Sequence, residues 1–546
     1  MESPPIQRVH DDVPGTILLV NLADGSHTHA QRGEIFLQPQ PSPDPNDPLN
    51  RSRGWKTLNI SMVYLYTFVI GICTAAHFSI LTQISESAKI SIGDLNLGTG
   101  LMQIMQGWCN LIWQPIAMTY GRRLVYVLTV VLSIGPVVWV PLGHGAGQWY
   151  AHRIILGVLC SSVEALPELS VQDLFFAHER GHYIALYAFV LFGSNFIAPF
   201  LAGFIADGAG WQWVMYFATI FLAVCSVIIF VFLEETIYFR TPTEGVEVIY
   251  EGDAAKKDDE SEHNLQLATP NSDYQGTETG TATPRKSRLQ KLGLVTKLPS
   301  RPTHKHMAWQ VWQSLTIPIF FPNILWAGLL YGSNLALYSV INGTISMILG
   351  SSPYNFRPTM VGVAYLSPFV FGGAASIWAG RLADHLAIKL AKRNGGVREP
   401  EHRLWILSVS ALMASGGMLM WGVGASQEAH YMVLIIGIGI TTFGVVCASA
   451  ISLAYATDCF EAMAGESFVS IMIIRNTIGF AFSYAITPWI DAMGLRDCFI
   501  SVSFISFFCT YTFLGVVFWG KSWRRLSAKR YWQFVSLQTE LSVTTS

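Results

Sequence analysis

The feature that most constrains this chain is the recurrence of apolar segments about 20 residues long. A helix needs roughly that length to cross the hydrocarbon core of a bilayer, where lipid offers its backbone no hydrogen-bond partner. Twelve such segments follow one another along the chain, with approximate limits 58–82, 97–118, 124–145, 149–173, 183–206, 211–233, 317–345, 359–383, 404–424, 430–456, 466–490 and 496–519. The sequence therefore predicts an all-α integral membrane protein with twelve transmembrane helices.

Composition agrees and disfavours several classes of function. Charged residues make up only 13% of the chain, against about 25% in soluble domains. The net charge of −2 gives no reason to expect a nucleic-acid partner. The eight Cys show no C-x-x-C or Cys/His spacing, so no metal, disulfide framework or cofactor is expected. Neither a nucleophile–base pair nor a glycine-rich phosphate loop is recognisable, which argues against an enzyme or an ATP-driven pump.

The basic residues of the loops indicate an orientation. Lys and Arg concentrate in cytoplasmic loops of membrane proteins. If both termini are cytoplasmic, the four short inner loops hold nine basic residues and the six outer loops hold three. The N-terminal 50 residues are polar and contain no apolar stretch typical of a signal peptide. We expect a multi-pass plasma-membrane protein with both termini in the cytoplasm.

A long polar segment divides the chain. Residues 241–280 hold ten acidic and two basic residues, and residues 281–310 hold seven Lys or Arg and no acid. A segment so poor in apolar residues cannot bury a core, so 241–310 is predicted to be a disordered cytoplasmic linker. The predicted organisation is a polar N-terminal tail at 1–56, six-helix halves at 57–240 and 311–520, and a C-terminal tail at 521–546.

Two loops in corresponding positions of the halves carry related motifs. The stretch WQPIAMTYGRR ends in Gly121, Arg122 and Arg123, and its counterpart begins GRLAD at 380–384. The first resembles the signature of the major facilitator superfamily between spans two and three, Gly-x-x-x-Asp-Arg-x-Gly-Arg-Arg, although Met118 replaces its Asp. The resemblance implies the major facilitator fold, with two six-helix halves that alternate access to a site near the midplane.

Further stretches resemble the twelve-span drug:proton antiporter branch of that superfamily. Arg153 and Gly157 fit its Arg-x-x-x-Gly pattern, and SNFIAPFLAG at 194–203 resembles the antiporter motif around Gly-Pro-x-x-Gly-Gly. The stretches DLFFAHERG, KRNGGVREPEHRL and TPWIDAMG resemble fungal members, closest to the histidinol and polyamine transporter-like subgroup. That subgroup also includes transporters encoded beside secondary-metabolite genes. The resemblance implies an antiporter-motif hinge at Ala198, Pro199 and Gly203.

Acids and arginines at the inner helix ends are predicted to gate the conformation. An acid there can pair with a loop arginine in one state and release it in the other. The candidates are Gly121, Arg122, Arg123, Asp173, Arg180, Asp384 and Asp458.

Ionisable residues inside the spans are the candidates for coupling, because such groups are costly in a bilayer and are usually functional. In the fourth span Glu164 and Glu168 follow Arg153 at offsets of 11 and 15, which places all three on one face of a regular helix. Two carboxylates one turn apart cannot both stay ionised cheaply, so the pair is predicted to bind protons or a cation. The alternative is a structural role, paired with a basic or amide group of a neighbouring span. Arg475 is expected either to receive an anionic group or to neutralise Glu164.

The resulting hypothesis is a monomeric secondary active transporter of a small organic solute, driven by protons through alternating access. The antiporter motif favours efflux of a drug-like or secondary-metabolite molecule. The acids inside the fourth span favour the alternative, proton-coupled uptake of an organic cation such as a polyamine. A channel or a transporter-like sensor is the remaining alternative. The sequence leaves the substrate and the direction open.

Overall fold

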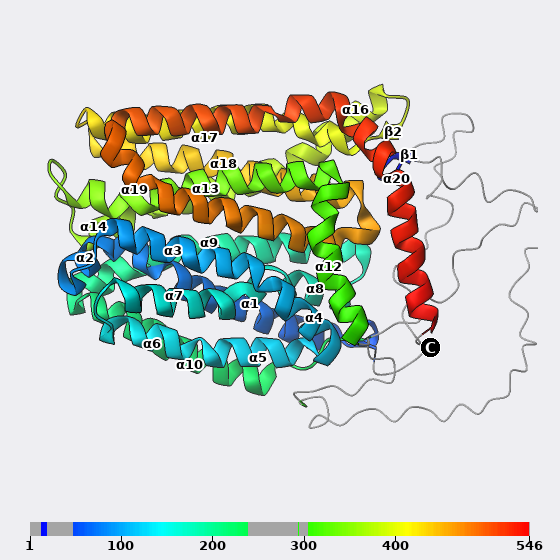
Figure 1. The fold of residues 1–546 in the computed structure, drawn as a ribbon, viewed down its shortest axis with the longest axis horizontal. Helices are drawn as coiled ribbons and strands as arrows, with labels where there is room; N and C mark the ends of the chain where they lie inside the picture. Colours follow the sequence, from blue (N-terminus) through cyan, green and yellow to red (C-terminus); the bar gives the residue numbers. More distant parts are fainter. Residues whose placement is uncertain (1–12, 19–46, 239–292, 294–303, 545–546) are drawn as a thin grey trace, which may run out of the picture.

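The protein is a bundle of long helices, most of which run along one common axis (Figure 1). The computed structural model describes residues 13–18, 47–238, 293 and 304–544. Within these residues, ten helical stretches are long and apolar enough to cross a membrane. The prediction of an all-α integral membrane fold is confirmed.

The helices of the first half follow the six predicted spans, and four of these spans contain more than one helix. A short 3-10 turn, Pro48–Asn50, precedes this half. Its helices are α1 (Arg53–Ala75), α2 (Leu81–Ala88), α3 (Ile92–Trp108), α4 (Asn110–Tyr120), α5 (Arg122–Leu132), α6 (Ile134–Leu142), α7 (Ala146–Cys160), α8 (Leu166–Leu174), α9 (Ala177–Ala209) and α10 (Trp211–Phe232). Two 3-10 turns, Ala76–Ile80 and Ser161–Glu164, join α1 to α2 and precede α8.

The second half packs beside the first and occupies the upper part of the view in Figure 1, apart from α12 and α20, which extend downward across one end of the bundle. Its helices are α12 (His304–Phe320), α13 (Pro322–Gly350), α14 (Pro358–Ala364), α15 (Leu366–Ile377), α16 (Ala383–Arg393), α17 (Leu407–Ser426), α18 (Tyr431–Cys459), α19 (Ala464–Tyr511) and α20 (Phe513–Thr544). A π-helical turn, Trp378–Leu382, lies between α15 and α16, and 3-10 turns at Pro400–Ile406 and Glu461–Met463 precede α17 and α19.

The structure differs from the sequence prediction at three places. The seventh span starts at Pro322 rather than at 317, because the extended backbone of Phe321 separates it from α12. The predicted second span, 97–118, forms α3 and α4 and is not among the ten stretches. Two short strands, β1 (Ile17–Leu18) and β2 (Val397–Arg398), pair antiparallel in a chain predicted to be wholly helical. The predicted linker lies outside the described residues, except for Gly293 and the start of α12 at His304.

The eleventh span and most of the twelfth lie in one helical element, α19, which is interrupted at a glycine. Gly494 has φ 77° and ψ 163°, a conformation that side-chain-bearing residues rarely adopt. The interruption falls between the predicted limits of these two spans.

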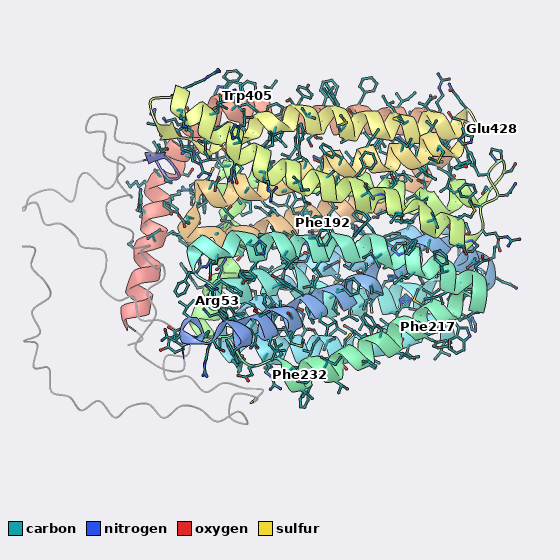
Figure 2. All side chains as sticks on the ribbon, turned by 180° about the vertical axis from the view of Figure 1, so that it is seen from behind. Arg53, Phe192, Phe217, Phe232, Trp405 and Glu428 are labelled. Carbon is teal, nitrogen blue, oxygen red and sulfur yellow. The ribbon has the colours of Figure 1, made fainter. Side chains whose placement is uncertain are left out.

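Each half has its own buried core, and apolar side chains also cover the outside of the bundle. Val227, Phe508 and Phe518 are 63%, 67% and 72% exposed. Figure 2 shows such side chains all along the helices. A continuous apolar exterior is the surface expected of a protein surrounded by lipid.

The two ends of the bundle differ in how closely the halves approach. We call the end with β1 and the start of α1 the termini end, and the other end, near Glu428 in Figure 2, the far end. At the far end α9 and α14 meet so closely that a Cβ on Gly203 would lie 2.4 Å from the carbonyl oxygen of Pro358. At the termini end a cavity of about 490 Å³ lies between α4, α8 and α9 of the first half and α18 and α19 of the second, and α12 crosses this end and packs on α4. We call this cavity the vestibule; the bundle is closed at the far end and open at the termini end.

Candidate functional site

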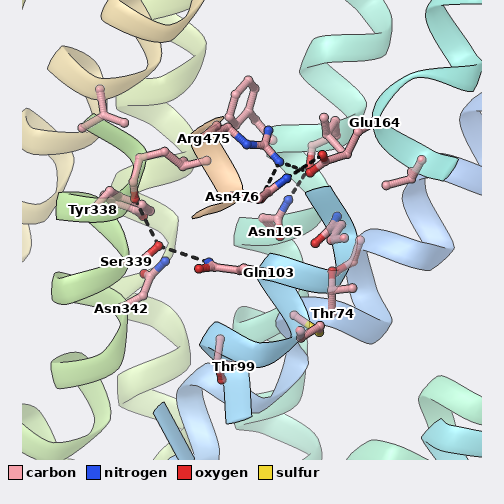
Figure 3. A pocket seen from close by; sticks show the side chains of 18 of the residues that line it. Thr74, Thr99, Gln103, Glu164, Asn195, Tyr338, Ser339, Asn342, Arg475 and Asn476 are labelled. Atoms are coloured by element: carbon pink, nitrogen blue, oxygen red, sulfur yellow. Dashed lines mark hydrogen bonds and ion pairs between the residues drawn. The ribbon is translucent and has the colours of Figure 1, made fainter. Parts of the chain in front are cut away.

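A central cavity of about 140 Å³ lies between the two halves. Its wall combines aromatic, amide and hydroxyl side chains with one acid and one arginine (Figure 3). The polar residues drawn there include Thr74, Thr99, Gln103, Glu164, Asn195, Tyr338, Ser339, Asn342, Arg475 and Asn476. A largely apolar pocket with a few convergent polar groups is the usual form of a small-molecule site.

A break in the fourth span places Glu164 in this wall. The α-helix α7 ends at Cys160, and a 3-10 turn carries Ser161–Glu164. Pro167 lies in the first turn of α8, where its missing N–H and its ring are tolerated, whereas in the interior of a continuous helix they would not be. The break between the two acids therefore follows from the sequence, and it turns Glu164 toward the second half.

Glu164 forms an ion pair with Arg475 of α19, in the opposite half. Asn476 donates a second hydrogen bond to this carboxylate, over 2.9 Å from its Nδ2 to Oε2. Arg475 also donates to the Tyr331 hydroxyl at 3.1 Å and to Asn476 Oδ1 at 3.0 Å. Of the two roles that the sequence left open for Arg475, this geometry corresponds to neutralisation of Glu164.

The contribution of this ion pair to stability depends on its burial. The side chains of Glu164 and Arg475 are 5% and 7% exposed. Removing one partner of a buried ion pair typically costs about 3–5 kcal/mol, because the other charge is left without compensation in a low dielectric. The pair joins the two halves in the cavity wall, so this energy depends on their relative position.

Glu168 lies on the first turn of α8 and has a different environment. Within the described part of the chain it has no ion-pair or hydrogen-bond partner, although it interacts electrostatically with Tyr187 and Tyr331. Tyr331 also accepts the hydrogen bond from Arg475. The two predicted acids are therefore distinct: one is paired across the halves and lines the cavity, and the other carries no counter-charge.

Arg153 is buried inside the first half. Its guanidinium lies over the ring of Trp149 at 4.4 Å and contacts Met102 Sδ at 3.6 Å, inside the first half. A Cβ on Gly157 would lie 2.4 Å from the Met102 carbonyl, so this glycine permits close packing of α7 on α3. The predicted alignment assumed an unbroken α-helix, and the 3-10 turn changes the angular relation between Arg153 and Glu164.

The gating candidates of the first half lie at the termini end. Gly121 has φ 116° and separates α4 from α5, which places Arg122 and Arg123 at the start of α5. Arg122 Nε lies 2.5 Å from Asp173 Oδ2. The backbone N–H groups of both arginines donate to Glu235, at 3.0 and 3.2 Å.

Arg123 and Arg180 bind main-chain carbonyls of their own half. Arg123 donates to the carbonyl oxygens of Leu233 and Phe230, both at 2.6 Å. Arg180 donates to those of Phe175 and Gln172, both at 3.0 Å, and also lines the vestibule.

The corresponding candidates of the second half form one charge cluster. Asp384 is paired with Arg403. Arg403 also lies 2.9 Å from Asp458 Oδ2, and Arg398 lies 3.5 Å from the same atom. The ion pairs named here for the two loops each stay within one half, which agrees with separation of the halves at this end.

The antiporter-motif residues lie on α9 where it meets the second half. Ala198 is buried, and a Cβ on Gly362 of α14 would lie 3.1 Å from the Pro199 carbonyl oxygen. The contact of Gly203 with Pro358 belongs to the same surface. Sequence reasoning thus identified the segment at the far-end contact, but not its partner helix.

Sequence reasoning missed the uncharged polar residues of the site. Gln103 donates to Ser339 Oγ at 3.4 Å and accepts from Ser483 at 3.4 Å, so it bridges the halves. Asn342, part of a glycosylation sequon, lines the cavity on α13. Side-chain amides inside otherwise apolar spans could have identified these residues as candidates, because buried amides need hydrogen-bond partners within the bundle. No group of three or more potential metal-binding side chains occurs among the described residues.

Two helical halves around a polar cavity, closed at one end and open at the other, define a secondary membrane transporter. The Major Facilitator Superfamily model matches residues 63–484, and the chain belongs to this superfamily. It is 28% identical to an uncharacterized MFS-type transporter of Schizosaccharomyces pombe, over 97% of this chain and 96% of the relative. It is 25% identical to Protein HOL1 of Saccharomyces cerevisiae, over 97% and 98%.

Two solved structures show the same fold. The xylose transporter XylE of E. coli matches with a TM-score of 0.55 and 10% identity, over 84% of this chain and 99% of that one. The human organic anion transporter MFSD10 matches with a TM-score of 0.52 and 15% identity, over the same shares. The chain is thus a secondary transporter of small solutes, and its family consists of transporters rather than enzymes.

Proposed function

We propose that this transporter exports an amphipathic organic solute, of the drug-like or secondary-metabolite class, in exchange for protons. It would lie in the plasma membrane as a monomer, with both termini and the vestibule facing the cytoplasm. The observation that carries the proposal is the Glu164–Arg475 ion pair, which joins the halves in the wall of the central cavity. The antiporter motif around Pro199 supports the exchange direction.

In this mechanism the solute enters through the vestibule and reaches the central cavity. Phe78, Phe192 and Phe196 offer it apolar contacts, and the amides of Gln103 and Asn195 offer hydrogen bonds. Glu164 cannot carry a proton and remain the ionic partner of Arg475. A proton that arrives from the far side would therefore free Arg475 and weaken the contact between the halves. Loss of that proton toward the termini side would restore the pair.

A second candidate function is proton-coupled uptake of an organic cation such as a polyamine. The observation that favours it is Glu168, a carboxyl group without a counter-charge among the described residues, close to the Tyr331 hydroxyl of the cavity wall. A cationic ammonium group would supply the missing charge. The resemblance of several stretches to the fungal histidinol and polyamine transporter-like subgroup also supports this candidate.

Flux into proteoliposomes under an imposed pH gradient tests both candidates. Vesicles of known orientation are loaded at one pH, diluted into another, and offered a cationic dye or labelled spermidine. Export by exchange predicts solute movement against the proton flow, and uptake by symport predicts movement with it. Flux that neither saturates nor responds to the gradient would contradict both and favour a channel.

A further inference from the structure

A short segment of the N-terminal tail packs on the second half rather than on the first. Arg524 of α20 is fully buried and donates to the Pro14 carbonyl oxygen at 2.6 Å and to Thr16 Oγ1 at 3.1 Å. In the antiparallel ladder of β1 and β2, Ile17 lies opposite Arg398. The tail thus reaches the half to which it is not joined in sequence.

The fit of this segment depends on a glycine. Gly15 has φ +80°, and a Cβ there would lie 2.5 Å from the Asp458 carbonyl oxygen and 3.0 Å from Cys459 Cα. Both contacts are to backbone atoms at the end of α18, which cannot move aside as a flexible side chain can. The Thr16 hydroxyl donates to Glu399 Oε2 at 3.1 Å and fixes the other side of the turn. The segment therefore occupies a site shaped for it.

That site belongs to the charge cluster at the termini end. The backbone of Arg398 pairs with β1, and its side chain forms an ion pair with Asp458. Asp458 also forms an ion pair with Arg403. A cavity of about 230 Å³ lies between Gly15 and these groups, with Thr457 and Glu461 in its wall. Thr457 and Glu461 also line the vestibule. The segment consequently lies at the rim of the vestibule.

The first half begins at this same end with α1. Trp55, in the first turn of α1, donates to Glu234 Oε2 at 2.8 Å. When the halves close at this end, the first half must approach the rim that residues 13–18 occupy.

We propose that residues 13–18 act as a wedge at this rim that holds the termini end open, and that release of this segment lets the end close. The inference rests on the two halves rocking about the central cavity. Its test needs neither a transported solute nor a proton gradient, so its failure is distinguishable from failure of the proposed function. The wedge would make the resting conformation a property of the tail as well as of the bundle.

The test is a distance measurement across the termini end of the full chain in nanodiscs. Spin labels are placed at His182 of α9 and Lys389 of α16, both exposed, in a background with Cys509→Ser. The distance distribution is measured by double electron–electron resonance for the parent, for Gly15→Val and for a chain lacking residues 2–18. Gly54→Ala is the matched control, because nothing lies within 4 Å of a Cβ at Gly54.

Gly15→Val and the truncated chain are expected to raise the ratio of short to long distances about tenfold. In these variants, closing the termini end no longer has to break the two or three hydrogen bonds that hold residues 13–18 in place. A peptide of residues 11–20 added to the truncated chain should restore the long distance. Unchanged distributions in both variants would overturn the proposal. A shift of equal size in Gly54→Ala, or a shift to longer distances, would overturn it as well.

Discussion

Replacing Glu164 by glutamine tests the coupling role of the ion pair with the least change in shape. Two unit charges about 4 Å apart attract by about 4 kcal/mol at an effective dielectric of ~20. Glutamine can still accept a hydrogen bond from Arg475, which retains ~1 kcal/mol. The substitution therefore removes about 3 kcal/mol of attraction between the halves, a change of about a hundredfold in a conformational equilibrium.

We expect Glu164→Gln to reach the membrane but to lose the dependence of transport on pH. For stability, the matched control is Glu168→Gln, which makes the same chemical change one turn away at a carboxyl group with no ion-pair partner among the described residues. The control should unfold at the same temperature as the parent or a higher one, whereas Glu164→Gln should unfold at a lower temperature.

The assay is initial transport rate against pH in proteoliposomes, with the amount of reconstituted protein measured for each variant. A double substitution, Glu164→Gln with Arg475→Gln, should recover part of the lost stability because it leaves no uncompensated charge. If Glu164→Gln transports at the parental rate with the parental pH dependence, the ion pair is structural and the coupling proposal is wrong.

Three further predictions concern the termini end. Tags at either terminus or within 241–310 should not react with impermeant reagents on intact cells, and external labelling in the linker would contradict the proposed orientation. Asp384→Lys should reduce transport without unfolding the protein, because it repels Arg403 and weakens a cluster that includes Asp458; parental rates at equal expression would show that the cluster is dispensable. Burial alone would raise the pKa of Glu399, but hydrogen bonds from Lys521 and Arg524 outweigh it and hold the pKa below its ordinary 4.5. Glu399 therefore contributes stability that is complete above pH 4.5 and is lost as the pH falls through the lowered pKa. The difference in Tm between the parent and Glu399→Gln, measured in detergent, should be constant above that pH and narrow below it; a difference that grows on acidification would refute this assignment.

The spans could be predicted because they follow from local composition. Apolar length fixes a membrane helix almost regardless of the remaining sequence, and Gly494 lies where two such lengths meet. Glu164 and Arg475 could also be recognised as candidates from the sequence, because charged residues inside apolar segments are rare.

The partners of these residues could not be predicted, because they depend on contacts between distant parts of the chain. Glu164 and Arg475 are 311 residues apart, and nothing local to either specifies the other. The position of Arg153 was misjudged because helical offsets assume uniform geometry, which the turn at Ser161–Glu164 breaks. The docking of Gly15 depends on the shape of a surface that forms only when α18 and α20 have packed.

The backbone contact of Gly203 with Pro358 gives the two ends of the bundle different sensitivities to the surrounding solution. The far end is sealed mainly by carbonyl and methylene groups and by neutral hydroxyls, such as those of Thr82 and Ser346 at 3.1 Å, together with one hydrogen bond to a carboxylate, from Thr359 to Asp207 at 2.7 Å. Dispersion and desolvation of this kind are nearly indifferent to ionic strength. The termini end is instead lined by loops of paired charges, whose interactions salt screens within about 8–10 Å. Added salt should therefore weaken the charge clusters at the termini end more than it weakens the packing at the far end.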